Sequence, residues 1–254
     1  MNDTTNQSKL LKPKLFLLVL VLTSLFFCIV FLSLQYRIFI YNYNYSITLN
    51  DIKIRPGYTS YDKYIRHQLH KTTNPKLRNI WTTRDWDRKI RVFARFFTQL
   101  KHEKFLSNSS KALCIGARMG QEVEALKRVG VNDSIGLDLV PYPPNVIKGD
   151  FHHQPFNDST FDFEFSNVFD HALYPDKFVG EIQRTLKPGG ICVLHVALSR
   201  RSDKYSVNDL YSVEPLKKLF NGSDLVQSRK VDGFGLDTEV VFRKKKTMIH
   251  MRNT

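Results

Sequence analysis

The sequence predicts an α/β fold with a mostly parallel seven-stranded sheet, preceded by a single N-terminal transmembrane helix. A long uncharged run lies near the N-terminus, strand-like and helix-like segments alternate beyond Lys111, and a glycine-containing turn follows the first of these strands. With 254 residues, 42% hydrophobic and 24% charged, the chain has room for one sizeable core and an appendage.

The uncharged run, Leu15–Leu34, reads LFLLVLVLTSLFFCIVFLSL. At about 1.5 Å per residue it spans the roughly 30 Å hydrocarbon core of a bilayer. Its hydrophobicity runs all round, which argues against a surface helix of a soluble domain. The alternative is a cleaved signal peptide, but the run is long for one and no small-x-small cleavage site follows it. We therefore expect residues 15–34 to anchor the chain in a lipid bilayer.

The charges on either side of this run predict its orientation. Lys9, Lys12 and Lys14 precede it, whereas Arg37 and Lys53 follow it. This bias favours a short cytosolic tail at residues 1–14 and a type II membrane protein of the Golgi or endoplasmic reticulum with a lumenal domain. N-glycosylation sequons, which are useful only in that compartment, begin at Asn44, Asn108, Asn132, Asn157 and Asn221.

Two segments of different character precede the alternating region. Residues 35–78 contain Pro56, Gly57 and Pro75 without a sustained period, and we interpret them as a stem or irregular lead-in. Residues 79–254 are predicted to form the domain, and its first segment, Asn79–Phe105, has a helical period. We expect that helix to cover one sheet face, the alternative being a substrate lid. The apolar positions of its period are Ile90, Phe93, Ala94, Phe97 and Leu100.

Beyond Lys111 the alternation is typical of parallel strands joined by crossover helices. Helices are expected at Gly120–Arg128, Pro175–Leu186 and Val213–Phe220. Strands are expected at Ala112–Ile115, Ser134–Leu137, Asn145–Lys148, Phe161–Ser166, Ile191–Ala197, Asp224–Lys230 and Glu239–Arg243.

The formal charge of +14 arises from 38 Lys and Arg against 24 Asp and Glu. It favours anionic partners such as lipid, polysaccharide or nucleic acid. Nucleic acid is the least favoured of these, because the basic residues are scattered and no recognition module lies among them.

Cysteine and histidine spacing predicts neither a disulfide framework nor a metal site. The three cysteines, Cys28, Cys114 and Cys192, lie in an apolar run and in two expected strands, where they act as small hydrophobic residues. The histidines near the expected strands do not have the spacing of metal ligands, so no metal is expected.

The segment Ala112–Leu126, ALCIGARMGQEVEAL, reads as a strand, a glycine-containing turn and the start of a helix. Gly116 and Gly120 allow the backbone to turn sharply, and a helix N-terminus offers free N–H groups to a ligand. A turn without a ligand is the alternative. The dinucleotide fingerprint is not met, because Arg118 and Gln121 stand where it requires glycine.

Polar side chains follow the next strands. Asp138 closes the second strand, where a carboxylate can accept hydrogen bonds from ribose hydroxyls. Asp150 and Phe151 follow the third, where a carboxylate can meet an adenine amino group and a ring can stack on the base. Asn167 follows the fourth. Ligands of such folds bind at the carboxyl ends of the strands.

Taken in order, the segments ALCIGARMG, GLDLVP, GDFHHQPF, FDFEFSNVFDHALYP and RTLKPGGICVLHV resemble the type 11 family of class I methyltransferases. They are similar to its plant membrane-anchored members. The resemblance covers residues 111–197 and implies a Rossmann-like fold and S-adenosylmethionine as the cofactor.

The resemblance also implies roles for single residues. Gly116, Ala117 and Gly120 would flank the methionine part of the cofactor, Asp138 would hold the ribose, Asp150 and Phe151 the adenine, and Asn167 would line the methyl-donor pocket. The sequence departs from the family in two ways. Arg118 stands where the family has a small residue, and the link after Asp138 is too short for the usual crossover helix.

The predicted activity is methyl transfer from S-adenosylmethionine to an unidentified acceptor. Asp170 and His171 follow Asn167, and His171 has the intrinsic pKa of a general base, so the two are the candidate catalytic residues. A histidine that only forms structural hydrogen bonds is the alternative. The competing functions are a membrane-bound, methyltransferase-like scaffold without turnover and a nicotinamide-dependent oxidoreductase.

Overall fold

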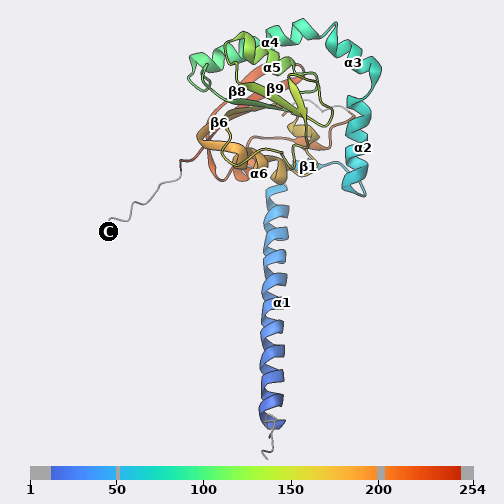
Figure 1. Ribbon diagram of the computed structural model, residues 1–254, viewed down its shortest axis with the longest axis vertical. Coiled ribbons are helices and arrows are strands. Elements are labelled where there is room, and N and C mark those ends of the chain that lie inside the picture. Colours follow the sequence, from blue (N-terminus) through green and yellow to red (C-terminus); the bar gives the residue numbers. More distant parts are fainter. Residues whose placement is uncertain (1–12, 50–51, 199–203, 247–254) are drawn as a thin grey trace, which may run out of the picture. The chain divides into compact units, whose positions relative to one another are not determined.

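The structure is a computed structural model that describes residues 13–49, 52–198 and 204–246 (Figure 1). The chain divides into two compact units, Met1–Ile47 and Thr48–Thr254. Among the described residues, the first unit holds most of helix α1, and the second holds the strands and the other helices.

Helix α1 comprises Pro13–Leu49. Within it, Leu15–Arg37 is long and apolar enough to cross a membrane by length and composition. Its side chains from residue 15 to residue 37 are exposed. The observation agrees with the predicted span 15–34 and fits an anchor or a signal sequence. Of the predicted tail, residues 1–12 lie outside the described residues.

The second unit is built on a seven-stranded sheet with the order β4-β3-β2-β5-β6-β9-β8. Strands β4, β3, β2, β5 and β6 run parallel, and β9 and β8 are antiparallel. All seven predicted strands are present, so the expected fold is confirmed. They are β2 (Ala112–Ile115), β3 (Ser134–Asp138), β4 (Val146–Lys148), β5 (Phe161–Ser166), β6 (Leu186–Val196), β8 (Ser223–Gly233) and β9 (Leu236–Lys244).

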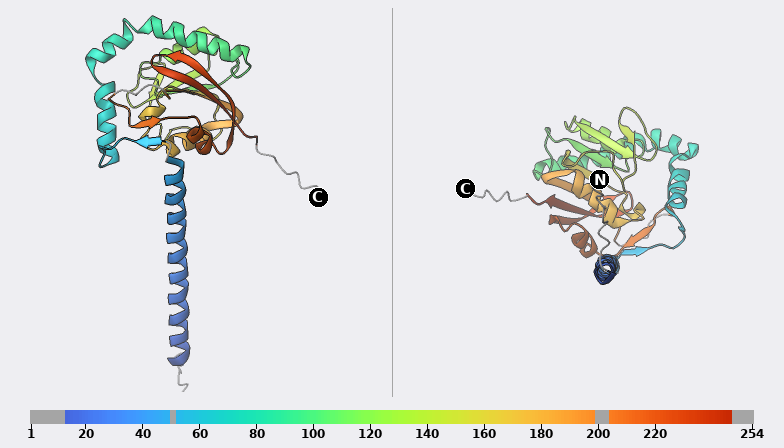
Figure 2. Two further views of the ribbon diagram at one scale, coloured as in Figure 1. Left: turned by 180° about the vertical axis from the view of Figure 1, so that it is seen from behind. Right: turned by 60° about the horizontal axis from the view of Figure 1, so that its bottom comes forward.

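Helices cover both faces of the sheet (Figures 1 and 2). On one face lie α4 (Trp86–His102) and α5 (Gln121–Arg128), and on the other lie α6 (Pro175–Thr185) and α7 (Glu214–Leu219). Alternate strand residues enter the two cores because side chains along a strand point to opposite faces: Cys114 packs with α4 and α5, and Leu113 with α6 and α7. The helix predicted within residues 79–105 therefore packs on the sheet, as expected.

The segment interpreted as an irregular lead-in is mostly ordered. It forms β1 (Ile52–Ile54), α2 (Tyr61–Thr72) and the start of α3 (Pro75–Thr82). Strand β1 pairs with β7 (Asn208–Leu210) in a separate two-stranded sheet. The expectation of an irregular segment is wrong for these residues because the buried side of α2 is largely polar, as at Gln68 and Thr72, so the helix shows little apolar periodicity.

The connection between β3 and β4 contains no helix, which confirms the expected loss of the usual crossover. Tyr142 and Val146 exchange backbone hydrogen bonds of 2.9 Å, and these fold the link into a tight turn. Strand β4 is thereby set beside β3 with Leu137 opposite Ile147. The link leaves the carboxyl ends of β3 and β4 close to the turn that follows β2.

Candidate functional site

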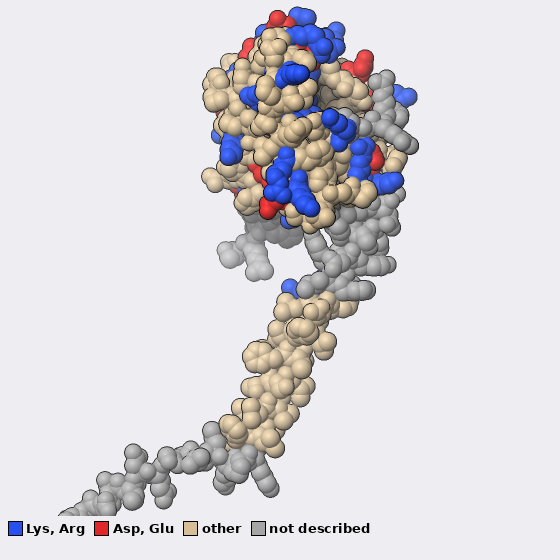
Figure 3. Space-filling view, turned by 90° about the vertical axis from the view of Figure 1, so that its right-hand side faces the viewer, with Lys and Arg blue, Asp and Glu red and all other residues tan. Residues whose placement is uncertain are grey.

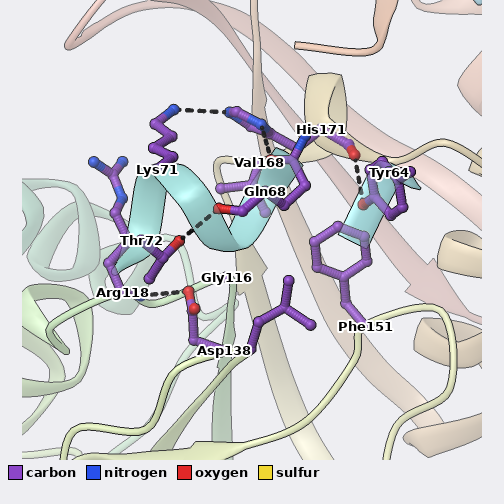
Figure 4. Close-up of a pocket in the computed structure, with 11 residues that line it drawn as sticks. Tyr64, Gln68, Lys71, Thr72, Gly116, Arg118, Asp138, Phe151, Val168 and His171 are labelled. Atoms are coloured by element: carbon purple, nitrogen blue, oxygen red, sulfur yellow. Dashed lines mark hydrogen bonds between the residues drawn. The ribbon is translucent and has the colours of Figure 1, made fainter. Parts of the chain in front are cut away.

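A cavity of about 50 Å³ lies at the carboxyl ends of β2 and β3, beneath helix α2 (Figure 4). Strand ends supply Gly116, Asp138 and Phe151 on one side. Helix α2 closes the other side with Tyr64, Gln68, Lys71 and Thr72, and the wall is completed by Arg118, Leu139, Val168 and His171.

The turn after β2 depends on two glycines. Gly116 has φ of +73° and lines the cavity, and a Cβ at this position would collide with the side chain of Val168. Gly120 has φ of +82° and caps the N-terminus of α5, where a Cβ would lie 2.9 Å from that of Asn145. Ala117 is buried and does not line the cavity. Of the three residues predicted to flank the methionine part of the cofactor, Gly116 thus lines the cavity, and Ala117 and Gly120 do not.

Arg118 adopts a left-handed backbone conformation with φ of +47°. Its backbone N–H donates to Asp138 Oδ2 at 2.9 Å, and its guanidinium carbon lies 5.2 Å from the ring centroid of Trp81. At this position, where the family has a small residue, the side chain of Arg118 thus lies over Trp81 while its backbone bonds to Asp138.

Asp138 is buried at the end of β3. Its Oδ1 accepts from the N–H of Val140 at 3.2 Å, and its Oδ2 accepts from Arg118. Burial raises the pKa of the carboxyl above its ordinary value, although these backbone donors act in the opposite direction. Carboxylate oxygens have further lone pairs, so Asp138 can still accept from a ligand hydroxyl in the cavity.

The two residues predicted to contact the adenine, Asp150 and Phe151, lie in different surroundings. Phe151 lines the cavity, whereas Asp150 is not part of its wall. Asp150 accepts hydrogen bonds from the hydroxyl of Tyr61 and from the backbone of His152, the latter at 2.9 Å. Although burial acts in the other direction, the side chains of His152 and Tyr61 and the backbone of His152 hold the pKa of Asp150 below its ordinary value. Asp150 thus connects α2 to the segment after β4.

Asn167 lies in the wall of a second cavity, of about 510 Å³. Its Nδ2 donates to Glu122 Oε1 at 3.1 Å. Glu122 is buried, and its Oε2 has no hydrogen-bond partner among the described residues. The two cavities adjoin, since both are lined by Lys71, Arg118 and His171.

The candidate catalytic residues do not form a dyad. His171 Nε2 lies 3.9 Å from Asp170 Oδ2, too far for a hydrogen bond. Instead, His171 Nδ1 lies 3.0 Å from Gln68 Oε1, and Nε2 lies 3.4 Å from Lys71 Nζ (Figure 4). Because an ammonium only donates, this arrangement favours the neutral tautomer with the proton on Nδ1. Asp170 accepts from the hydroxyl of Ser206.

Helix α2 supplies wall residues that the sequence analysis did not identify. Its hydrogen-bonded N-cap Ser60 and first-turn Asp62 are a helix-start signal, and Tyr64, Gln68 and Thr72 recur at four-residue steps on one face. That signal was present in the sequence. Among the described residues, no group of three His, Cys, Asp or Glu side chains is placed to hold a metal ion.

The sequence model of the type 11 methyltransferase family, described as a methyltransferase domain, matches residues 113–194. This segment begins in β2 and includes Gly116, Asp138, Phe151 and Asn167. Within this segment the chain is similar to class I methyltransferases.

Solved structures share the fold of this chain. One is a Burkholderia thailandensis 1,6-didemethyltoxoflavin-N1-methyltransferase with bound S-adenosylhomocysteine, which matches with a TM-score of 0.57 and 16% identity over 77% of this chain and 95% of that one. Another is the [4+2]-cyclase SpnF, with a TM-score of 0.50 and 15% identity over 60% of this chain and 81% of that one. At these identities the likeness concerns the fold alone.

Curated relatives match over shorter segments. A sterol 24-C-methyltransferase of Schizosaccharomyces pombe is 48% identical over 46 residues, 18% of this chain and 12% of its own length. A sterol methyltransferase-like protein of Botryococcus braunii is 33% identical over 84 residues, 33% of this chain and 21% of its own length. The chain thus spans a small part of both relatives, and its likeness to plant membrane-anchored members stays a prediction.

Proposed function

We propose that this protein transfers a methyl group from S-adenosylmethionine to an acceptor while anchored to a membrane through α1. The observation that carries the proposal is the convergence of Gly116, Asp138 and Phe151 on one cavity at the carboxyl ends of parallel strands. A backbone without Cβ, a buried carboxylate and an aromatic ring are groups that suit, respectively, close approach, ribose hydroxyls and a base.

Each residue has a distinct task in this proposal. Asp138 would accept from the ribose hydroxyls, Phe151 would contact the adenine, and Gly116 would leave room for the methionine part. The unpartnered Oε2 of Glu122 offers a buried acceptor near Asn167. Asp150 would act indirectly, by holding α2 through Tyr61. Ala117 and Gly120 would shape the turn rather than touch the cofactor.

When bound, S-adenosylmethionine supplies a methyl group on a positively charged sulfur, which leaves as the neutral thioether S-adenosylhomocysteine after transfer. The main task of the protein is to hold the acceptor in line with the bond that breaks. A hydroxyl acceptor must also lose its proton. His171 borders both cavities and is our candidate for receiving that proton at Nε2, once Lys71 has moved from it.

The membrane part of the proposal rests on α1. We propose that Leu15–Arg37 spans the bilayer and that the second unit lies in the lumen of the Golgi or endoplasmic reticulum. Four sequon asparagines, Asn108, Asn132, Asn157 and Asn221, are exposed, which supports a lumenal location because an enzyme can reach them there.

A scaffold without turnover is the second candidate, and one observation favours it. The cavity beside Asp138 holds about 50 Å³, whereas ligand pockets typically hold roughly 300–1,000 Å³. Taken without the adjoining second cavity, this space is too small for a ligand of cofactor size. A chain that kept α2 closed would retain the fold and lose the activity, as fold alone does not determine function.

The test is calorimetric titration of the full chain in neutral-lipid nanodiscs with S-adenosylmethionine and, separately, NADH. We expect the first to bind and Asp138→Ala to weaken it on the order of a hundredfold, because two hydrogen bonds to a carboxylate are lost. Asp133→Ala, which removes an exposed carboxylate in the loop before β3, is the matched control. Binding of NADH alone, or of neither, contradicts the proposal.

Turnover separates the enzyme from the scaffold. Incubation with methyl-labelled S-adenosylmethionine and a microsomal extract should label acceptor molecules and produce S-adenosylhomocysteine, and Asp138→Ala should abolish both. Tight cofactor binding without any S-adenosylhomocysteine formation would favour the scaffold.

A further inference from the structure

The second cavity has a composition that indicates what it binds. At about 510 Å³ it is large enough for a small molecule. Aromatic rings of Trp81, Tyr205 and Phe234 line it, together with the basic side chains of Lys71, Lys89 and Arg118. One carboxylate, Asp170, also lines it, and this carboxylate already accepts from Ser206. The wall therefore combines ring surfaces with an excess of positive charge.

Lys89 is the most informative of these basic residues. It lies in α4, is largely shielded from solvent, and forms no ion pair with any described residue. Its Nζ is 5.4 Å from the ring centroid of Phe234. Burial and the nearby charge of Arg118 lower its pKa to about 8, against the attraction of Glu122 and Asp85. A charge held in such surroundings gains most from a bound anion.

Arg118 points to the same chemistry. Its guanidinium lies over Trp81 and, within the described chain, pairs with no carboxylate. The backbone of this residue is left-handed, which costs energy for a residue other than glycine. A planar guanidinium beside an aromatic ring suits an aromatic carboxylate, because one part can pair with the anion while the ring surface stacks.

A neutral polycyclic acceptor fits this wall poorly. A sterol would cover Lys89 and Arg118 without offering an anion to either, and burying unpaired charges is costly. The face of the second unit that Figure 3 shows carries more basic than acidic side chains, which would favour the approach of an anion.

We propose that the methyl acceptor is an aromatic carboxylate, with its anion held by Lys89 and Arg118 and its ring against Trp81 and Phe234. That this ligand is the methyl acceptor rests on the proposed methyl transfer, but its binding does not require the cofactor. The carboxylate acts as the recognition group of the acceptor, whereas a hydroxyl of the same molecule takes the methyl group from the sulfonium and gives its proton to His171.

The test measures acceptor binding directly, with the full chain in phosphatidylcholine nanodiscs at pH 7. The probes are several hydroxylated aromatic acids, among them 3-(4-hydroxyphenyl)propanoate, each compared with its neutral amide, and ergosterol. We expect at least one acid to bind about tenfold more tightly than its amide. This preference should disappear in Lys89→Gln, persist in Lys89→Arg, and be unchanged in Arg91→Gln, which removes an exposed charge from the same helix.

Binding of S-adenosylhomocysteine is measured in the same samples and should be equal in the wild type and Lys89→Gln, which also shows that the variant is folded. The inference is overturned if no acid binds more tightly than its amide, if the preference survives in Lys89→Gln, or if ergosterol binds best. A retained acid preference without S-adenosylhomocysteine binding would instead contradict the proposed methyl transfer and leave the anion site standing.

Discussion

At the scale of single residues, the turn after β2 contains a position that only glycine tolerates. Gly116→Ala should lower the free energy of unfolding by about 2 kcal/mol, because a Cβ is strained at φ of +73° and meets Val168. Gly180→Ala is the matched control, since Gly180 lies inside α6 with open space around it. It should stabilise by about 0.5–1 kcal/mol. Chemical unfolding of both variants measures the difference, and equal effects would contradict this account of the turn.

Glu164 gives the domain a pH-dependent stability. The side chain is fully buried in β5, Thr185 donates to its Oε1 at 2.7 Å, and burial raises its pKa to about 8. The folded state therefore keeps the proton up to about pH 8, whereas an unfolded chain loses it near the ordinary pKa of a glutamate, 4.5. The stability linked to this proton is fully present below the unfolded value and declines as pH rises through the folded one.

Glu164→Gln should remove this decline, since an amide cannot ionise. Its unfolding temperature should match that of the wild type near pH 5 and exceed it at pH 9. The difference at pH 9 should correspond to about a few kcal/mol in the free energy of unfolding. Glu214→Gln, at an exposed position of α7, should change neither value. A higher unfolding temperature of the wild type at pH 9 would instead show that Glu164 is ionised and stabilised in the folded state.

Lys89 gives acceptor binding a different pH dependence. With a pKa of about 8, its ammonium loses its proton above that pH, so kcat/KM for an anionic acceptor should fall between pH 7 and pH 9. Lys89→Arg keeps its charge and should move the fall to higher pH. The neighbouring charges are Arg118, Glu122, Asp85 and Arg88. If kcat/KM falls over the same pH range in the wild type and in Lys89→Arg, the group that titrates is not Lys89.

At the scale of elements, the pattern of apolar residues predicts the sheet but not helix α2, whose start is marked by its capping residue alone. Strand-like segments such as Phe161–Ser166, where phenylalanine alternates with polar residues, differ clearly from their surroundings, and their alternation with helices indicates a mostly parallel sheet. The buried side of α2 instead carries Gln68, which bonds to Tyr205 and His171, and Thr72, whose hydroxyl donates to the carbonyl of Gln68. Periodicity of apolar residues does not detect such a face.

The candidate site was likewise predictable from the sequence only in part. Gly116, Asp138 and Phe151 follow strands, and the topology brings them to one cavity. The bonds of Asp150 with Tyr61 and of His171 with Gln68 join segments about 90 and 100 residues apart. Their partners lie on the helix whose docking the sequence did not indicate, so these two roles depended on tertiary structure.

Because α2 forms one wall of the cavity, its side chains should affect cofactor binding. Gln68 donates to the carbonyl of Tyr205 at 2.8 Å and bonds to His171, so Gln68→Ala should loosen this wall. We expect roughly a tenfold weaker affinity for S-adenosylhomocysteine. Arg66→Ala, on the exposed side of the same helix, should have no effect. Equal affinities in the titration would exclude α2 from the binding site.

At the scale of the whole molecule, the orientation in the membrane can be tested chemically. If the second unit is lumenal, Asn108, Asn132, Asn157 and Asn221 are exposed to the glycosylation machinery. Expression in a eukaryotic cell should then give a protein whose electrophoretic mobility changes on treatment with an N-glycosidase. Asn157→Gln should remove one increment of this change. An unmodified protein that protease digests in intact microsomes would place the unit in the cytosol.

The pairing of β1 with β7 also sets an order for biosynthesis. Arg55 and Asp209, which form an ion pair of 2.6 Å beside this pairing, are 154 residues apart in sequence. At about 5–20 residues per second, a ribosome needs on the order of ten to thirty seconds to synthesise the chain between them. During that interval β1 has no partner strand, and α2 has neither Asp150 nor His171 until those residues emerge. The first part of the domain to be made is therefore among the last to acquire its native contacts, and a chaperone that binds nascent chains would find its substrate there.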